Sequence, residues 1–169
     1  MRAALAILAA LAFGLSSMAA PASARWQQKT APSTGDSVTF ENAAAAAGLT
    51  MTHVNGSSPD KYLVETMGSG AAFLDFDDDG WVDLFFVDGG SLADPAVAGR
   101  ARHRLFRNQG NGTFRDVTDA SGIRHRDYGM GVCAGDVDGD GRVDLYVTNY
   151  GPNALYRNAG KGAFADITR

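Results

Sequence analysis

The chain has 169 residues, of which 15 are Lys or Arg and 19 are Asp or Glu, and its net charge is −4. Such mild acidity gives no electrostatic reason to expect a nucleic acid as partner. The single cysteine, Cys133, excludes an intramolecular disulfide, which makes a bound metal a candidate for stabilising the fold. Cys133 lies in the small apolar stretch 131–135, which predicts a buried thiol that packs as a small hydrophobe.

The first 24 residues have the order of a secretory signal peptide. Arg2 gives a positive start, residues 3–15 form an uncharged apolar run, and residues 22–24 (Ala-Ser-Ala) suit cleavage. The run is shorter than the ~20 apolar residues that span a membrane, which favours a cleaved signal over an anchor. No second apolar run of that length follows, so the sequence predicts a secreted or periplasmic protein without a membrane span after signal removal. Residues 25–37 are polar, with Pro, Ser and Gly, and predict a flexible leader.

Residues 38–169 contain an internal repeat. Residues 68–87 and 129–148 share a Gly-x-Gly pair, spaced aspartates, a central glycine and an Asp-Leu pair, at an offset of 61 residues. A second block recurs at 105–118 and 155–168, with Arg-Asn near its start and Gly-x-Phe near its end. Self-similarity at a fixed period predicts a repeat architecture in which neighbouring units stack.

The offset of the second block is 50 residues, so the first copy carries about 11 additional residues within 88–104. Gly, Ser, Pro and Ala in that stretch predict a loop insertion. A fainter third copy precedes the other two, because residues 40–42 and 48–49 match 114–116 and 122–123 in spacing. The third copy supplies only a strand segment at the beginning of the repeat region.

Each full copy predicts four short strands, because runs rich in Val, Phe, Tyr and Thr are separated by Gly and Asn. The expected strands are 69–74, 82–88, 104–108 and 113–118 in the first copy, and 131–135, 143–148, 154–158 and 163–168 in the second. Residues 84–87 are apolar at every position, which predicts cover on both faces of that strand. Such units suit stacked blades. The fold class is therefore an all-β partial β-propeller of about two four-stranded blades, at about 68–118 and 129–168, plus an N-terminal strand segment.

Each copy also contains an acidic loop with aspartates at positions one, three, five and nine and a glycine at position six. The residues are Asp75, Asp77, Asp79, Gly80 and Asp83 in the first copy, and Asp136, Asp138, Asp140, Gly141 and Asp144 in the second. Calcium takes six to eight oxygen ligands, many of them carboxylates, and clustered carboxylates repel one another without a cation. Trp81 and Arg142 at position seven would add backbone carbonyl oxygens. The pattern predicts about two Ca²⁺ ions, one in each loop.

Other interpretations of the loops fit less well. Surface Asp/Gly turns without a metal are the plain alternative, and two copies in register make that alternative weaker. An EF-hand needs a Glu at position twelve and flanking helices, whereas position twelve is Phe86 in one copy and Val147 in the other, between expected strands. Magnesium prefers a tighter octahedron with retained waters.

The paired motifs resemble FG-GAP/VCBS repeats of the cartilage-acidic-protein-like and ASPIC/UnbV group, with the integrin α-subunit head as a more distant relative. The resemblance covers about residues 38–169. It implies a β-propeller, usually of seven blades, with calcium held by the aspartate loops at the blade edges. The family's name motif is altered here to residues 67–70 and 128–131. Only two full blades are present, so the comparison implies a truncated propeller, and open strand edges predict self-association.

Several polar residues have simpler interpretations. The Arg-Asn pairs at 107–108 and 157–158 are expected to serve hairpin turns, and the three histidines, His53, His103 and His125, show no ligand spacing and are expected in loops or on the surface. The triplets that begin at Asn55 and Asn111 match the glycosylation sequon, which Asn-Gly turns also produce.

The expected function is that of an exported calcium-binding repeat module for protein–protein or cell-surface interaction, without catalysis. Its partner would be a protein or a surface glycan. No nucleophile elbow, phosphate loop or His-Glu-x-x-His motif is present in the sequence. The alternatives are a fragment of an exported hydrolase or other propeller enzyme that uses paired aspartates, and a structural remnant whose binding parts are lost.

Overall fold

The structure is a computed structural model that describes residues 38–124 and 127–169. The expected signal peptide, the leader and His125 lie outside the described residues. Residues Glu41–Arg169 form one compact unit.

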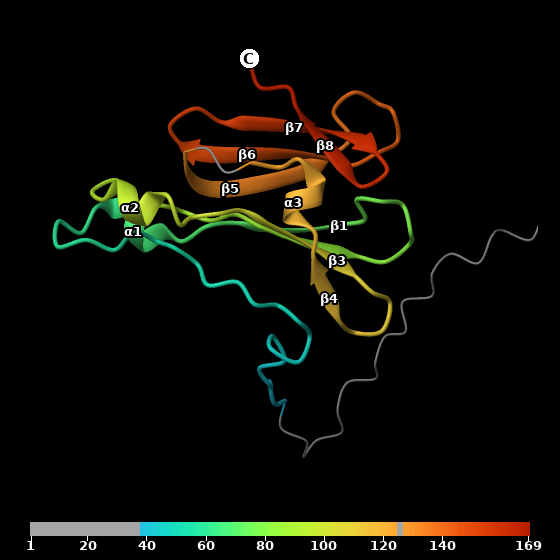
Figure 1. The fold of residues 1–169 in the computed structure, drawn as a ribbon, viewed down its shortest axis with the longest axis horizontal. Helices are drawn as coiled ribbons and strands as arrows, with labels where there is room; N and C mark the ends of the chain where they lie inside the picture. Colours follow the sequence, from blue (N-terminus) through green and yellow to red (C-terminus); the bar gives the residue numbers. More distant parts are fainter. Residues whose placement is uncertain (1–37, 125–126) are drawn as a thin grey trace, which may run out of the picture. The chain divides into compact units, whose positions relative to one another are not determined.

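The compact unit contains two four-stranded antiparallel sheets, each a simple meander in chain order (Figure 1). Blade 1 consists of β1 (Ala71–Leu74), β2 (Asp83–Phe86), β3 (Arg104–Asn108) and β4 (Phe114–Asp116). Blade 2 consists of β5 (Tyr128–Gly135), β6 (Asp144–Tyr150), β7 (Ala154–Gly160) and β8 (Ala163–Asp166). Three short helices are α1 (Leu63–Met67), α2 (Pro95–Ala98) and α3 (Thr118–Ser121). The all-β partial propeller of two four-stranded blades is therefore confirmed, but the expected N-terminal strand segment does not form, since residues 38–62 contain no strand.

Both blades have the same strand register. Phe85 pairs with Leu105 in blade 1, and Tyr146 pairs with Leu155 at the corresponding position of blade 2. The first two strands of blade 2 are longer than expected: β5 begins at Tyr128 and β6 continues to Tyr150, with a bulge between Gly129 and Gly131.

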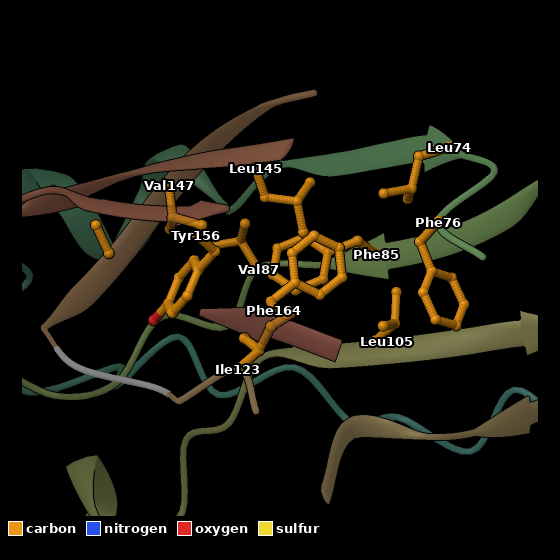
Figure 2. Packing of buried hydrophobic residues seen from close by; sticks show 11 residues of the cluster. Leu74, Phe76, Phe85, Val87, Leu105, Ile123, Leu145, Val147, Tyr156 and Phe164 are labelled. Atoms are coloured by element: carbon orange, nitrogen blue, oxygen red, sulfur yellow. The ribbon is translucent and has the colours of Figure 1, made fainter. Parts of the chain in front are cut away.

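A single apolar core joins the two blades (Figure 2). Every second side chain along a strand points to the same face of its sheet. The faces that the two blades turn toward each other are both apolar. Blade 1 and its flanking segments contribute Leu74, Phe76, Phe85, Val87, Leu105 and Ile123, and blade 2 contributes Leu145, Val147, Ala154, Tyr156 and Phe164. Close packing of this kind fixes how neighbouring repeats stack.

Cys133 is not buried, contrary to expectation. Its side chain is exposed, because it pairs with Tyr146 on the face of blade 2 that points away from the core. Tyr146 is itself 40% exposed. The apolar stretch around Cys133 reflects a strand of small residues rather than an interior position.

The connection between the blades includes α3, which ends at Gly122 in a left-handed conformation (φ 79°). A Cβ atom at Gly122 would lie 2.6 Å from the carbonyl oxygen of Phe164 in β8. The same arrangement occurs before blade 1, where a Cβ on Gly48 (φ 79°) would lie 2.6 Å from the carbonyl oxygen of Phe114. The faint third copy in the sequence therefore corresponds to a repeated connection in space.

We expect Gly122→Ala to lower the free energy of unfolding by about 3 kcal/mol, through the left-handed backbone and the clash together. Gly112→Ala is the matched control, because Gly112 has φ 85° but open space around its Cβ position. The control should lose only about 1 kcal/mol. Denaturant unfolding of both variants checks this result, and equal losses would contradict the close packing of the connection on β8.

The insertion in blade 1 is anchored by Asp88, which is 2% exposed. Its carboxylate accepts hydrogen bonds from the backbone N–H groups of Val54 (2.7 Å), Gly89 (3.2 Å) and Arg102 (2.7 Å). Asp88 also lies 3.0 Å from His53 Nδ1. The two ends of the insertion and the segment before α1 thus meet at one buried carboxylate.

His103 is buried rather than exposed, with 1% of its surface accessible. Its Nδ1 accepts a hydrogen bond from the backbone N–H of Asp88 (3.0 Å), and its ring packs edge-on against Phe85 at a centroid distance of 5.8 Å. The insertion therefore folds back onto blade 1 instead of extending into solvent as a simple loop.

Candidate metal centre

The two acidic loops occupy equivalent places, between β1 and β2 in blade 1 and between β5 and β6 in blade 2. The glycine at position six is left-handed in both, with φ 85° at Gly80 and φ 87° at Gly141. Only this backbone geometry lets the loop reverse and bring its early and late aspartates together. The glycine position therefore has the role that the sequence predicts.

Three aspartates of each loop come together. One carboxylate oxygen from each of Asp75, Asp77 and Asp83 lies within 4.8 Å of the others, and the same holds for Asp136, Asp138 and Asp144. These are positions one, three and nine. Oxygen-only sets with this spacing suit a hard divalent cation, which carboxylates bind at about 2.3–2.6 Å.

Position five is not part of either triad. Asp79 accepts a hydrogen bond from the backbone N–H of Trp81 (2.9 Å), and Asp140 accepts one from Arg142 in the same way (2.9 Å). Each aspartate thus holds the turn at position seven. The expected ligand roles of the position-five carboxylates and of the Trp81 and Arg142 carbonyl oxygens stay predictions.

The aspartate at position one organises its loop. Asp75 accepts backbone hydrogen bonds from Asp79 (3.1 Å) and Gly80 (2.9 Å). Asp136 does the same for Gly139 (2.7 Å), Asp140 (3.1 Å) and Gly141 (2.8 Å). In blade 2, the N–H groups of Gly141 and its neighbours hold the pKa of Asp136 below its usual range.

The aspartate at position nine is buried and ties the loop to the next strand. Asp83 is 0% exposed and accepts hydrogen bonds from the backbone N–H groups of Phe76 (3.1 Å) and Asn108 (2.7 Å). Asp144 is 1% exposed and accepts them from Val137 (2.9 Å) and Asn158 (2.7 Å). Burial raises the pKa of Asp83 despite these donors.

The Arg-Asn pairs also contact the acidic loops, beyond the hairpin turns that the sequence predicts for them. Asn108 Nδ2 donates to the carbonyl oxygen of Val82 (2.9 Å), and Asn158 Nδ2 donates to that of Val143 (3.2 Å). Each asparagine thus clamps the end of its acidic loop. Sequence reasoning missed this role, although the recurrence of Arg-Asn at a fixed distance from each loop was a signal for it.

Arg107 makes the loop of blade 1 different from that of blade 2. Its guanidinium pairs with Asp77 (2.6 Å) and Asp79 (2.9 Å). The corresponding Arg157 lies 3.9 Å from Asp138, and Arg142 pairs instead with Asp140 at 2.9 Å. Burial raises the pKa of Asp77, and the charge of Arg107 opposes that rise.

The loop of blade 1 also contains a buried carboxylate oxygen, Asp77 Oδ1, without a hydrogen-bond partner among the described residues. A buried carboxylate oxygen without a partner is costly, and a cation held by the triad would satisfy it. The donor set and this unpaired oxygen both fit a calcium ion.

The fold and the acidic loops together define a repeat protein of the β-propeller class with a candidate metal site in each blade. The model of the FG-GAP-like repeat family matches residues 75–147 and 136–169. The chain therefore belongs to the FG-GAP-like repeat family. No curated protein and no solved structure matches the chain.

Proposed function

We propose that the chain is an exported calcium-binding repeat module that mediates protein–protein or cell-surface contacts without catalysis. The observation that carries the proposal is the pair of equivalent aspartate triads. FG-GAP-like repeats are typical of extracellular proteins, and within the described residues no helix has the length and apolarity to span a bilayer. The resemblance to the cartilage-acidic-protein-like and ASPIC/UnbV group supports the same assignment.

Calcium would neutralise each triad and brace the loop between its strands. In blade 1 the ion would be held by Asp75, Asp77 and Asp83, and in blade 2 by Asp136, Asp138 and Asp144. The buried position-nine aspartate would connect the ion to β3 or β7 through its backbone hydrogen bonds. Metal binding would thus stiffen the blade edge that meets a protein or a glycan.

Calorimetric titration of calcium into the chain and two single variants tests this proposal. Wild type should bind two ions, whereas Asp77→Asn and Asp138→Asn should each bind one, because each variant loses a ligand from one triad. Asp78→Asn is the control, since Asp78 is exposed and has φ 57°, which Asn tolerates. Loss of both ions in either single variant, or no binding by wild type, would contradict independent sites.

The two sites should release calcium at different pH. Burial raises the pKa of both Asp77 and Asp83, whereas backbone donors lower the pKa of Asp136. A protonated carboxyl does not bind calcium, so the site in blade 1 should lose its ion first as pH falls from about 7 to about 4.

Without metal, a fall in pH has the opposite effect and stabilises the folded chain through Asp77 and Asp83, because their pKa values are raised in the folded state. This stabilisation is complete below the pKa of the same groups in the unfolded chain, and it is lost as pH rises through their pKa values in the folded chain.

Titrations of Asp138→Asn and Asp77→Asn over this pH range isolate the sites of blade 1 and blade 2 respectively. Release from blade 2 before blade 1 would show that the burial of Asp83 does not govern proton competition.

A further inference from the structure

We infer that blade 2 packs its free face against blade 1 of a second copy of this chain, so that copies associate head to tail. The inference rests on the blade faces and not on the metal proposal. Blade 1 turns the face that carries Phe85 toward the shared core, and we call this face, and the equivalent face of blade 2 with Tyr146, the front face. Blade 2 turns the face that carries Leu145 toward the core, and we call this face, and the equivalent face of blade 1 with Phe73, the back face.

The front face of blade 2 is not covered by the described residues, and it carries apolar side chains together with the exposed Thr148, the counterpart of Val87. Phe85 on the front of blade 1 is 0% exposed, while Tyr146 at the corresponding place in blade 2 is 40% exposed. Ile167 on the same face is 39% exposed, and its counterpart Val117 packs against the core. A groove on this face is lined by Tyr146, Pro152, Asn153, Leu155, Ile167, Thr168 and Arg169.

The back face of blade 1 is likewise not covered by the described residues. Ala134 on the back of blade 2 packs against the core, whereas Phe73 at the corresponding place in blade 1 is 76% exposed. An apolar groove beside Phe86 is also lined by Leu49, the counterpart of the core residue Ile123. The turn at residues 43–49 already contacts β4, since Ala47 accepts a hydrogen bond from the N–H of Phe114 (2.7 Å). Within residues 38–124 and 127–169, blade 1 thus has the connection that belongs to a preceding blade, and no front face of such a blade covers it.

The core inside the chain supplies the pattern for the contact. Asn158 Nδ2 donates across the blades to the carbonyl oxygen of Phe76 (2.8 Å), and the rings of Phe76 and Phe164 lie 6.3 Å apart. Phe76 is only 3% exposed, while its counterpart Val137 is 56% exposed. Asn108, the counterpart of Asn158, is placed to donate to the carbonyl oxygen of Val137 in a second copy.

Residue size also favours a second copy as the occupant. The internal interface has Leu74 on the front and the small Ala134 on the back, both in the apolar core region. On the two free faces the sizes at the equivalent positions are reversed: the small Gly135 stands on the front of blade 2, and the large Phe73 stands on the back of blade 1. The large residue of one free face therefore meets the small residue of the other. Contact between two different faces is heterologous, so it continues from copy to copy until a ring closes.

Sedimentation of the chain in calcium, at concentrations up to about 1 mM, tests the inference with two variants. Phe73→Glu blocks the back face and Tyr146→Glu blocks the front face. We expect wild type to associate and each variant to sediment as a single chain. A mixture of the two variants should form a dimer that does not extend, because one intact front and one intact back remain. Leu63→Glu in α1 is the control, since Leu63 is 75% exposed but lies on neither face.

Cys133 provides a second measurement without a further substitution. It lies exposed on the front face of blade 2, so association should slow its reaction with a bulky maleimide, and Phe73→Glu should restore the rate from the opposite face. A wild type that stays a single chain throughout would overturn the inference. If only one variant abolished association, or if the mixture stayed monomeric, the inference would also be overturned. Either result would indicate that the contact joins two like faces or uses another surface.

Discussion

Asp83→Ala should lower the free energy of unfolding by about 3 kcal/mol even in chelator, because two buried backbone donors lose their acceptor. These donors are the N–H groups of Phe76 and Asn108, which both point at the Asp83 carboxylate. The loss should be larger in calcium, since the substitution also removes a ligand that the proposed site of blade 1 needs. Denaturant unfolding with calcium and with chelator measures both effects.

Asp75→Ala separates the two contributions. Asp75 belongs to the same triad but is less buried than Asp83, and its hydrogen bonds stay within the exposed loop. We expect its effect in chelator to be about 1 kcal/mol or less, with most of its loss confined to calcium. Equal losses for both variants in chelator would contradict the bridging role of Asp83 between the loop and β3.

Asp88→Ala should cost about 4 kcal/mol, the largest effect of a single polar substitution that we expect. Three buried or half-buried backbone N–H groups, from Val54, Gly89 and Arg102, would lose one acceptor together. The segment before α1 and the returning end of the insertion should then loosen from blade 1. Hydrogen exchange should show faster exchange at Val54 and Arg102 while the strands of blade 2 keep their protection.

Asp94→Ala is the control for Asp88, because Asp94 lies in the same insertion but only caps α2 through the N–H of Ala96 (2.8 Å). Loss of a helix cap costs about 1 kcal/mol. A similar loss in the two variants, or unchanged exchange at Val54, would show that Asp88 does not anchor the insertion.

The strand pattern and the acidic loops could be predicted because they depend on local rules that recur. Runs rich in Val, Phe, Tyr and Thr, separated by Gly and Asn, located the eight strands. The spacing of aspartates around a glycine identified the two loops, in each of which three of the four predicted aspartates meet. The position-nine aspartate could be predicted as a member of the loop. Its role as a buried connector could not, because one donor to each of these aspartates comes from β3 or β7, 25 or 14 residues away.

The errors come from contacts between distant parts of the chain. Cys133 has an apolar neighbourhood in sequence but lies on the uncovered face of blade 2. His103 and Asp88 stand at a loop in sequence, yet the fold of the insertion buries both of them. None of these facts has a local signal in the sequence, since each depends on which surfaces meet.

The most direct test of the central claim is a thermal melt of the chain in calcium, in magnesium and in excess chelator, with bound metal measured in parallel. Calcium that binds only the folded chain adds about 2.7 kcal/mol per site at a hundredfold excess over Kd. We therefore expect calcium to raise the melting temperature by at least several degrees, with two ions per chain, and magnesium to have a smaller effect. An identical melting temperature in all three conditions, with no bound metal, would contradict the account.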